Sequence, residues 1–156
     1  MKLAEALLLR ADMQKKIASL RERIVANAVV QEGDKPHEDP EKLLKEAHGV
    51  IADLETLVAA INEANLKVKL SDGRTMTQAL AHRDAISAQH ALLVATIAGC
   101  RKEPERYGVR EIKWVTQLDV GKLQKQVDDL AKKLRELNAQ VQQANWAAEL
   151  KVKLGG

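Results

Sequence analysis

A weak tandem repeat of a helical hairpin constrains the fold of this chain more than any other feature. Residues 2–28 resemble residues 75–99 at an offset of 73, which aligns Arg10 with Arg83. Residues 41–66 resemble residues 121–146 at an offset of 80, which aligns Asn65 with Asn145. Such a repeat predicts two copies of one supersecondary unit. The aligned apolar pairs are Leu3 and Met76, Ala6 and Ala79, Leu20 and Leu93, Leu54 and Leu134, and Leu57 and Leu137.

Each repeat contains two segments in which apolar residues recur in alternating steps of three and four. This spacing is typical of helices that pack along a coiled-coil seam. It predicts helices over about 2–30, 40–65, 75–99 and 119–148. Asp39 and Asp119 are expected to be helix N-caps, and Pro40 suits the first helical position. We therefore expect a mainly α protein with four long helices in two antiparallel coiled-coil-like hairpins, residues 1–66 and 75–149, within a single domain of residues 1–156.

Three short segments are interpreted as extended. Residues 66–70 and 111–117 alternate or combine apolar and polar side chains as short strands do, and residues 150–154 repeat the letters of 66–70. Residues 101–110 contain Pro104 and Gly108 and are expected to form a loop. A small β element should therefore accompany the helices.

The composition narrows the classes of protein to which the chain can belong. Hydrophobic residues make up 46% and aromatic residues 2% with no Phe, so the core must consist of Leu, Val, Ile and Ala. Because 25 basic residues nearly balance 22 acidic ones, a dedicated nucleic-acid binder is not expected. The longest nearly uncharged run, residues 85–100, is too short and too polar to be a transmembrane segment. One cysteine and no recognisable signal peptide predict a cytoplasmic protein.

The candidate site residues are polar groups on the apolar seams. Arg10 and Arg83 occupy core-type positions in both repeats, and a buried guanidinium is costly unless it is paired. In an antiparallel hairpin Arg10 is level with Asn62, Glu63 and Asn65, while Arg83 is level with the segment that ends at Asn145. Two interpretations follow. The arginines are either structural, extending their heads out of the seam or pairing with these groups to fix the register, or they form a site for an anion or a partner.

Other chemistry has weaker support in the sequence. No metal site is expected, because His37, His48, His82 and His90 do not match the Glu-x-x-His pattern of di-metal bundles. No phosphate loop or nucleophile elbow is present, so no cofactor and no catalytic residue is assigned. Cys100 ends a predicted helix, which raises a thiol pKa, and precedes two cations, which lower it. It is a possible reactive thiol and otherwise a small residue of the seam.

A set of strings spread over residues 1–150 resembles a family of uncharacterised bacterial proteins labelled septicolysin. The resemblance implies a thiol-activated, pore-forming toxin. The sequence shows no secretion signal, no long amphipathic β-hairpins and no Trp-rich membrane loop, all of which that activity would require. The strings are Met1-Lys-Leu-Ala-Glu-Ala-Leu, Arg10-Ala-Asp, Arg21-Glu-Arg, Val30-Gln-Glu-Gly33, Glu38-Asp-Pro, Ile61-Asn62, Arg83-Asp84, Glu111-Ile-Lys-Trp114-Val, Leu123-Gln-Lys-Gln-Val-Asp-Asp-Leu and Gln143-Ala-Asn-Trp146.

Three functions are compatible with these observations. The first is a self-associating helical scaffold or adapter, which four seams and the apolar run Leu7, Leu8 and Leu9 favour. The second is an anion- or small-molecule-binding protein or enzyme that uses the seam Arg and Asn residues. The third is the pore-forming toxin that the resemblance implies. The partners expected for the first are a second copy of the chain or an unidentified protein.

Overall fold

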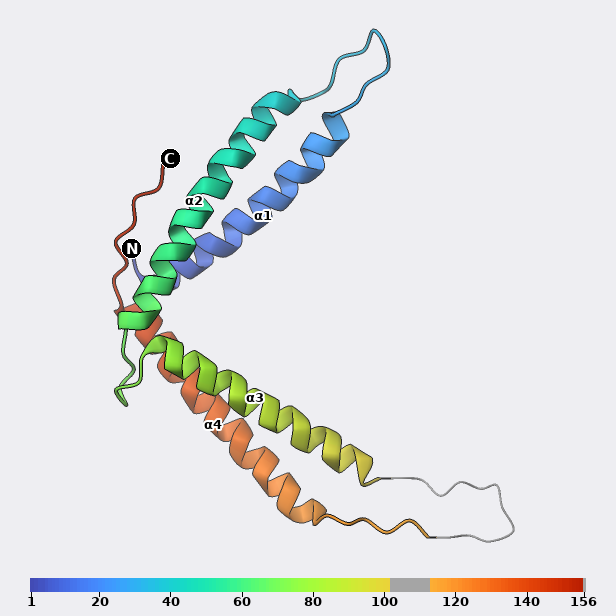
Figure 1. Cartoon of the computed structure of the whole chain (residues 1–156), viewed down its shortest axis with the longest axis vertical. Coiled ribbons are helices and arrows are strands. Elements are labelled where there is room, and N and C mark those ends of the chain that lie inside the picture. The colour runs from blue at the N-terminus through green and yellow to red at the C-terminus, as the bar shows by residue number, and fades with distance from the viewer. Residues whose placement is uncertain (102–112, 156) are drawn as a thin grey trace, which may run out of the picture. The chain divides into compact units, whose positions relative to one another are not determined.

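Four long helices form almost all of the regular structure of the chain (Figure 1). The computed structural model describes residues 1–101 and 113–155. The helices hold 73% of these residues, which confirms a mainly α fold. No helix in the described ranges is both long and apolar enough to cross a bilayer. The helices are α1 (Leu3–Asn27), α2 (Pro40–Lys67), α3 (Met76–Gly99) and α4 (Val120–Ala147).

The helices pair in the order that the repeat predicts. Helices α1 and α2 form hairpin one, and α3 and α4 form hairpin two, as Figure 1 shows. The chain divides into two compact units. One comprises Met1–Lys69 together with Gln142–Gly156, and the other comprises Leu70–Val141. The last turn of α4 and the residues that follow it therefore belong with hairpin one.

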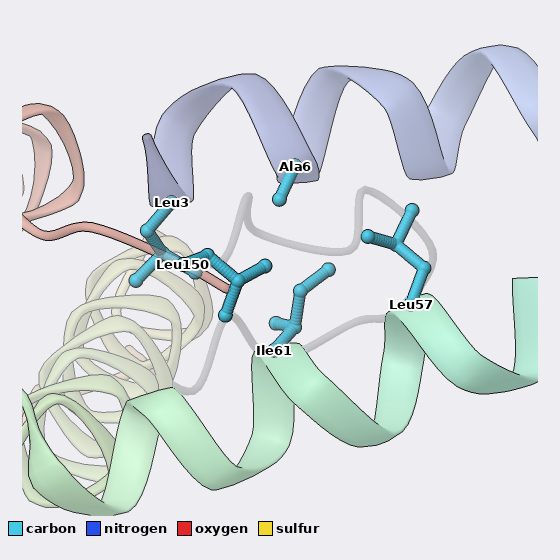
Figure 2. Packing of buried hydrophobic residues seen from close by; sticks show 5 residues of the cluster. All are labelled: Leu3, Ala6, Leu57, Ile61 and Leu150. Carbon is cyan, nitrogen blue, oxygen red and sulfur yellow. The ribbon is translucent and has the colours of Figure 1, made fainter. Parts of the chain in front are cut away.

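The seams predicted from the heptad pattern are the buried faces of the helices. In α1 the seam residues Leu3, Ala6 and Leu20 are buried. Leu3 and Ala6 are three residues apart, and Leu20 follows Ala6 by two heptads. In α2 the seam buries Leu43, Ala47, Leu57 and Ile61. Leu3 and Ala6 of α1 face Leu57 and Ile61 of α2 in Figure 2, with Leu150 inserted between the helices.

The two hairpins share their helix-terminal hydrogen bonds as well as their seams. The Lys2 N–H donates to Glu5 Oε2 at 2.6 Å, and the equivalent Thr75 N–H donates to Gln78 Oε1 at 2.9 Å. The Asp39 side chain accepts from Lys42 N–H in hairpin one. Asp119 accepts from Lys122 N–H at 3.1 Å in hairpin two. These bonds satisfy helix N-terminal donors that would otherwise be unpaired, and they confirm both Asp N-caps.

Hairpin one is closed at its turn by three side chains. The Asn27 side chain donates to Arg23 O at 2.9 Å and accepts the Glu38 N–H at 3.0 Å. The Arg23 guanidinium also pairs with the Glu38 carboxylate. The hydrogen bond and the charge of Arg23 lower the pKa of Glu38. Gly33 supplies the positive φ of +91° that the turn requires.

The expected β element is reduced to isolated bridge residues within the described parts of the chain. Residues 66 and 67 belong to α2, because helical hydrogen bonding continues until the Val68 N–H donates to Ala64 O. Lys2 and Glu149 form an antiparallel bridge, and the aligned residues Thr75 and Lys69 of the second repeat are also bridge residues. Residues 113–117 are irregular. Residues 111 and 112 and most of the expected loop at 101–110, including Pro104 and Gly108, lie outside the described residues.

The identical strings at 66–70 and 150–154 are not structural equivalents. The Leu70 N–H donates to Arg74 O and the Leu150 N–H donates to Met1 O, both at 2.8 Å. Leu70 therefore corresponds to Leu150, as the offset of 80 between α2 and α4 requires. Both leucines are buried, with 5% and 6% of their surface exposed.

Residues 148–155 form an extended segment, here called the C-terminal strap, that lies along α2 (Figure 1). Leu150, Val152 and Leu154 pack on the core of hairpin one, while the lysines between them are exposed. This alternation follows from the period-two geometry of an extended chain. At its end the Gly155 N–H donates to Asp53 Oδ1 of α2 at 2.7 Å.

Candidate binding groove on hairpin two

A groove runs along one side of hairpin two, between α3 and α4. It consists of two hollows of about 160 and 360 Å³ that share Lys133. We call it the α3–α4 groove. The smaller hollow is lined by Arg74, His82, Ile86, Lys133, Glu136, Leu137 and Gln140. The larger is lined by Gln89, Leu92, Leu93, Gln126, Asp129, Leu130 and Lys133.

The groove has an apolar floor and a polar rim. Ile86 and Leu137, each 4% exposed, lie on the floor of the smaller hollow. Lys133 is exposed on the rim and forms no ion pair with any residue in the described ranges. Arg74, by contrast, is held by Asp72, whose carboxylate accepts from the Arg74 Nε at 2.8 Å. The hydrogen bond from the Arg74 side chain lowers the pKa of Asp72. Lys133 is thus a cation on the rim that is available to a ligand.

The equivalent side of hairpin one is closed. Lys16 and Glu46 stand where hairpin two has Gln89 and Gln126, and their Nζ and Oε1 atoms are 2.8 Å apart. The hydrogen bond from Lys16 lowers the pKa of Glu46. The C-terminal strap covers the adjoining part of hairpin one. The groove therefore exists on hairpin two because neither the ion pair nor a strap covers it there.

A second apolar surface lies on α3, opposite its hairpin seam. Its residues recur in alternating steps of four and three, and all of them are exposed. Leu92 is the largest of them, with 66% of its surface exposed. The equivalent positions on α1 are mostly polar and include Asp12, Lys15 and Glu22. We call this surface the outer face of α3, and it comprises Ala81, Ala85, Ala88, Leu92, Ala95 and Gly99.

The arginines predicted as site residues do not make the expected pairs. The Arg10 Nε is buried and has no hydrogen-bond partner among the described residues. Glu63, which sequence reasoning placed near Arg10, pairs with Lys67 of its own helix. Arg83 is held by its sequence neighbour Asp84, with the Nε and Oδ1 atoms 3.3 Å apart. Among the described residues these arginines do not form the pairing alternative, because local partners on the same helix satisfy Glu63 and Arg83. The anion or partner site at Arg10 and Arg83 stays a prediction.

The remaining predicted residues are scattered. Asn62 is exposed, Asn65 is half-buried and Asn145 is buried at 5% exposure. Cys100 is a free, half-buried thiol beside a hollow of about 390 Å³ that Trp114 and Leu118 also line. Within residues 1–101 and 113–155 no three His, Cys, Asp or Glu side chains are placed to hold a metal ion.

Sequence reasoning missed both the groove and the outer face of α3. The four-three spacing of the small residues on α3 was available as a signal, since it is the spacing of a second seam. The offset of 80 also aligns Asp53 with Lys133, a reversal of charge within the repeat. Neither signal by itself shows which side of hairpin two is exposed. That becomes clear only by comparison with hairpin one, where the strap and the Lys16–Glu46 ion pair cover the equivalent side.

Comparison with known proteins finds a similar structure and a matching family, and the function of both is unknown. A crystal structure of a functionally unknown conserved protein from Corynebacterium diphtheriae is similar over 97% of this chain and 99% of that one, with 34% identity and a TM-score of 0.86. The comparison with curated proteins gave no match. Residues 10–150 match the sequence model of a family of unknown function, DUF6847. The chain, with its two equivalent hairpins and the groove on the second, therefore belongs to the family of unknown function DUF6847.

Proposed function

We propose that this protein is a self-associating helical scaffold in which two copies pair through the outer face of α3. The observation that carries the proposal is the exposure of this face together with its composition. From Ala85 to Cys100 the helix contains no Asp, Glu, Lys or Arg, yet the outer face is open to solvent. A helix that is apolar on opposite sides is normally covered on both.

The spacing of the face favours a second helix as its occupant. Alternating steps of four and three place about one residue per turn on a continuous stripe, which is the arrangement of a coiled-coil seam. Alanine and glycine allow the backbones of two helices to approach closely, and Leu92 supplies one large apolar contact. A two-fold pair needs only one patch of this kind, because each copy offers the same surface to the other.

The size of the face predicts a weak dimer. Helix α3 has 24 residues and is about 36 Å long at about 1.5 Å per residue. If the contact is about 10 Å wide, the two copies bury about 700 Å² in total, below the roughly 1,200 Å² of a stable interface. Association should therefore depend on concentration in the micromolar range or above.

The single Cys100 and the absence of any disulfide suit a reducing compartment such as the cytoplasm.

Sedimentation equilibrium over a wide range of protein concentration tests the proposal. The average mass should rise toward that of a dimer, and the double change Ala88→Glu with Ala95→Glu should return it to the monomer mass. Ser87→Glu is the matched control, because Ser87 is exposed on α3 but lies outside the outer face. Helix content by circular dichroism should be the same in all variants. A monomer mass at every concentration, or a double variant that associates as the wild type does, contradicts the proposal.

A further inference from the structure

The α3–α4 groove is the counterpart of a surface that is already occupied on hairpin one. There the C-terminal strap packs Val152 and Leu154 on the cluster around Leu57, and Met13 packs on the same cluster. The repeat aligns Met13 with Ile86 and Leu57 with Leu137. Both of the aligned residues line the smaller hollow of the groove. Hairpin one thus shows how an extended chain can lie on this side of the hairpin.

Hairpin two receives only the first residue of such a segment. Leu70 is buried and corresponds to Leu150, but the chain then turns at Asp72 and Gly73 instead of continuing as a strap. Gly73 adopts a positive φ of +87°, and Asp72 accepts the Arg74 N–H at 3.0 Å, so the turn is fixed by its own contacts. The positions that Val152 and Leu154 fill on hairpin one therefore have no counterpart from this chain on hairpin two.

The charge at the point where the two hollows of the groove meet is reversed relative to hairpin one. On hairpin one Asp53 accepts the N–H of Gly155. The aligned residue on hairpin two is Lys133, whose ammonium group can only donate. His82 and Glu136 also line this hollow; Arg74 is neutralised by Asp72, and Glu136 by Lys132. An occupant that fits hairpin two must therefore present an acceptor, and a carboxylate is the complementary group.

We propose that the α3–α4 groove binds an extended segment of a partner protein, with one large apolar side chain against Ile86 and Leu137 and a carboxylate at Lys133. The volume of the smaller hollow, about 160 Å³, suits one such side chain, since a cavity of about 150 Å³ holds a benzene-sized group. The binding mode copies that of the C-terminal strap, but the occupant comes from another molecule. The contact at the smaller hollow does not use Leu92, which the larger hollow shares with the outer face of α3.

The probe is an acetylated and amidated peptide with the sequence Lys-Val-Lys-Leu-Asp, which is residues 151–155 of the strap with an aspartate at the position of Gly155; it omits Leu150, whose position on hairpin two is filled by Leu70. A second peptide that ends in Asn has the same shape without the charge. Each is titrated into full-length ¹⁵N-labelled protein, and amide chemical shifts report both the site and the affinity. We expect the Asp peptide to shift amides of Ile86, Leu137 and Gln140 and to bind more tightly than the Asn peptide, by about fivefold at low salt.

Two exposed lysines on α4 give a matched pair of variants. Lys133→Glu should remove the preference for the Asp peptide, whereas Lys125→Glu, outside both hollows, should retain it. The amide spectrum of each variant shows directly whether it is folded. The proposal is overturned if neither peptide shifts hairpin-two amides at millimolar concentration, if Lys133→Glu keeps the preference, or if the shifts centre on Asp53 and Leu57 instead. The last result would mean that the peptide displaces the strap from hairpin one.

Discussion

Replacement of Leu150 by alanine should destabilise hairpin one, although Leu150 lies outside both helices of that hairpin. Leu150 is 6% exposed and packs with Leu3, Leu57 and Ile61. Leu→Ala removes three buried carbon groups at about 0.8 kcal/mol each, or about 2.4 kcal/mol. The strap is a thin segment at the edge of the core and can move inward, so the cavity term should be small. We expect a total loss of about 3 kcal/mol in the free energy of unfolding.

Urea denaturation followed by circular dichroism measures this loss. Leu154→Ala is the matched control, because Leu154 belongs to the same strap but is only half-buried, and its truncation should cost about 1 kcal/mol. Amide hydrogen exchange should show the loss of protection in α1 and α2. A loss below about 1 kcal/mol for Leu150→Ala, or equal losses for Leu150→Ala and Leu154→Ala, would refute the view that the strap completes this core.

Three further predictions follow from contacts in the described residues. Asn27→Ala should cost about 1–2 kcal/mol in urea denaturation, because it leaves the partly buried Glu38 N–H without its acceptor. Arg10→Met should leave the unfolding free energy unchanged or raise it by about 1 kcal/mol, since it removes a buried N–H that has no partner; a clear loss would show that the guanidinium is paired in solution. Arg23→Gln should return the pKa of Glu38, which Arg23 lowers, toward its ordinary value. Because a lowered carboxyl pKa stabilises the fold above the unfolded value of about 4.3, this contribution should be lost in the wild type as pH falls through the folded pKa. NMR titration of the Glu38 side chain in both proteins tests this.

The parts of the fold that could be predicted from the sequence are those that short-range periodicity controls. The seams and the caps at Asp39 and Asp119 depend on residues within a few turns of one another, and the pairing of the helices follows from the repeat. The end of α2 was placed two residues too early, because the alternating apolar and charged residues after Asn65 are compatible with either a helix or a strand. For the same reason residues 66 and 67 of the expected strand 66–70 are helical, whereas Lys69 is an isolated bridge residue.

The site could be predicted much less well than the fold. Whether a seam residue such as Arg10 is paired depends on side-chain geometry that spacing does not fix. Whether a hairpin side is open depends on residues far away in sequence: Glu149 pairs with Lys2, and Gly155 meets Asp53. The repeat does contain the differences that open the groove, Asp53 against Lys133 and Glu46 against Gln126. Their meaning becomes clear only once the strap is seen on hairpin one.

The position of the strap also fixes the order in which a nascent chain can finish its two cores. Leu70 precedes α3 and α4, so hairpin two has all of its buried residues once α4 leaves the ribosome. Hairpin one is made first, but its core lacks Leu150 until the segment that follows α4 has been translated. During synthesis α1 and α2 can pair early through local contacts, which form fastest. The later hairpin should nevertheless reach its final stability first, and the earlier one remains the part of the nascent chain with exposed apolar surface.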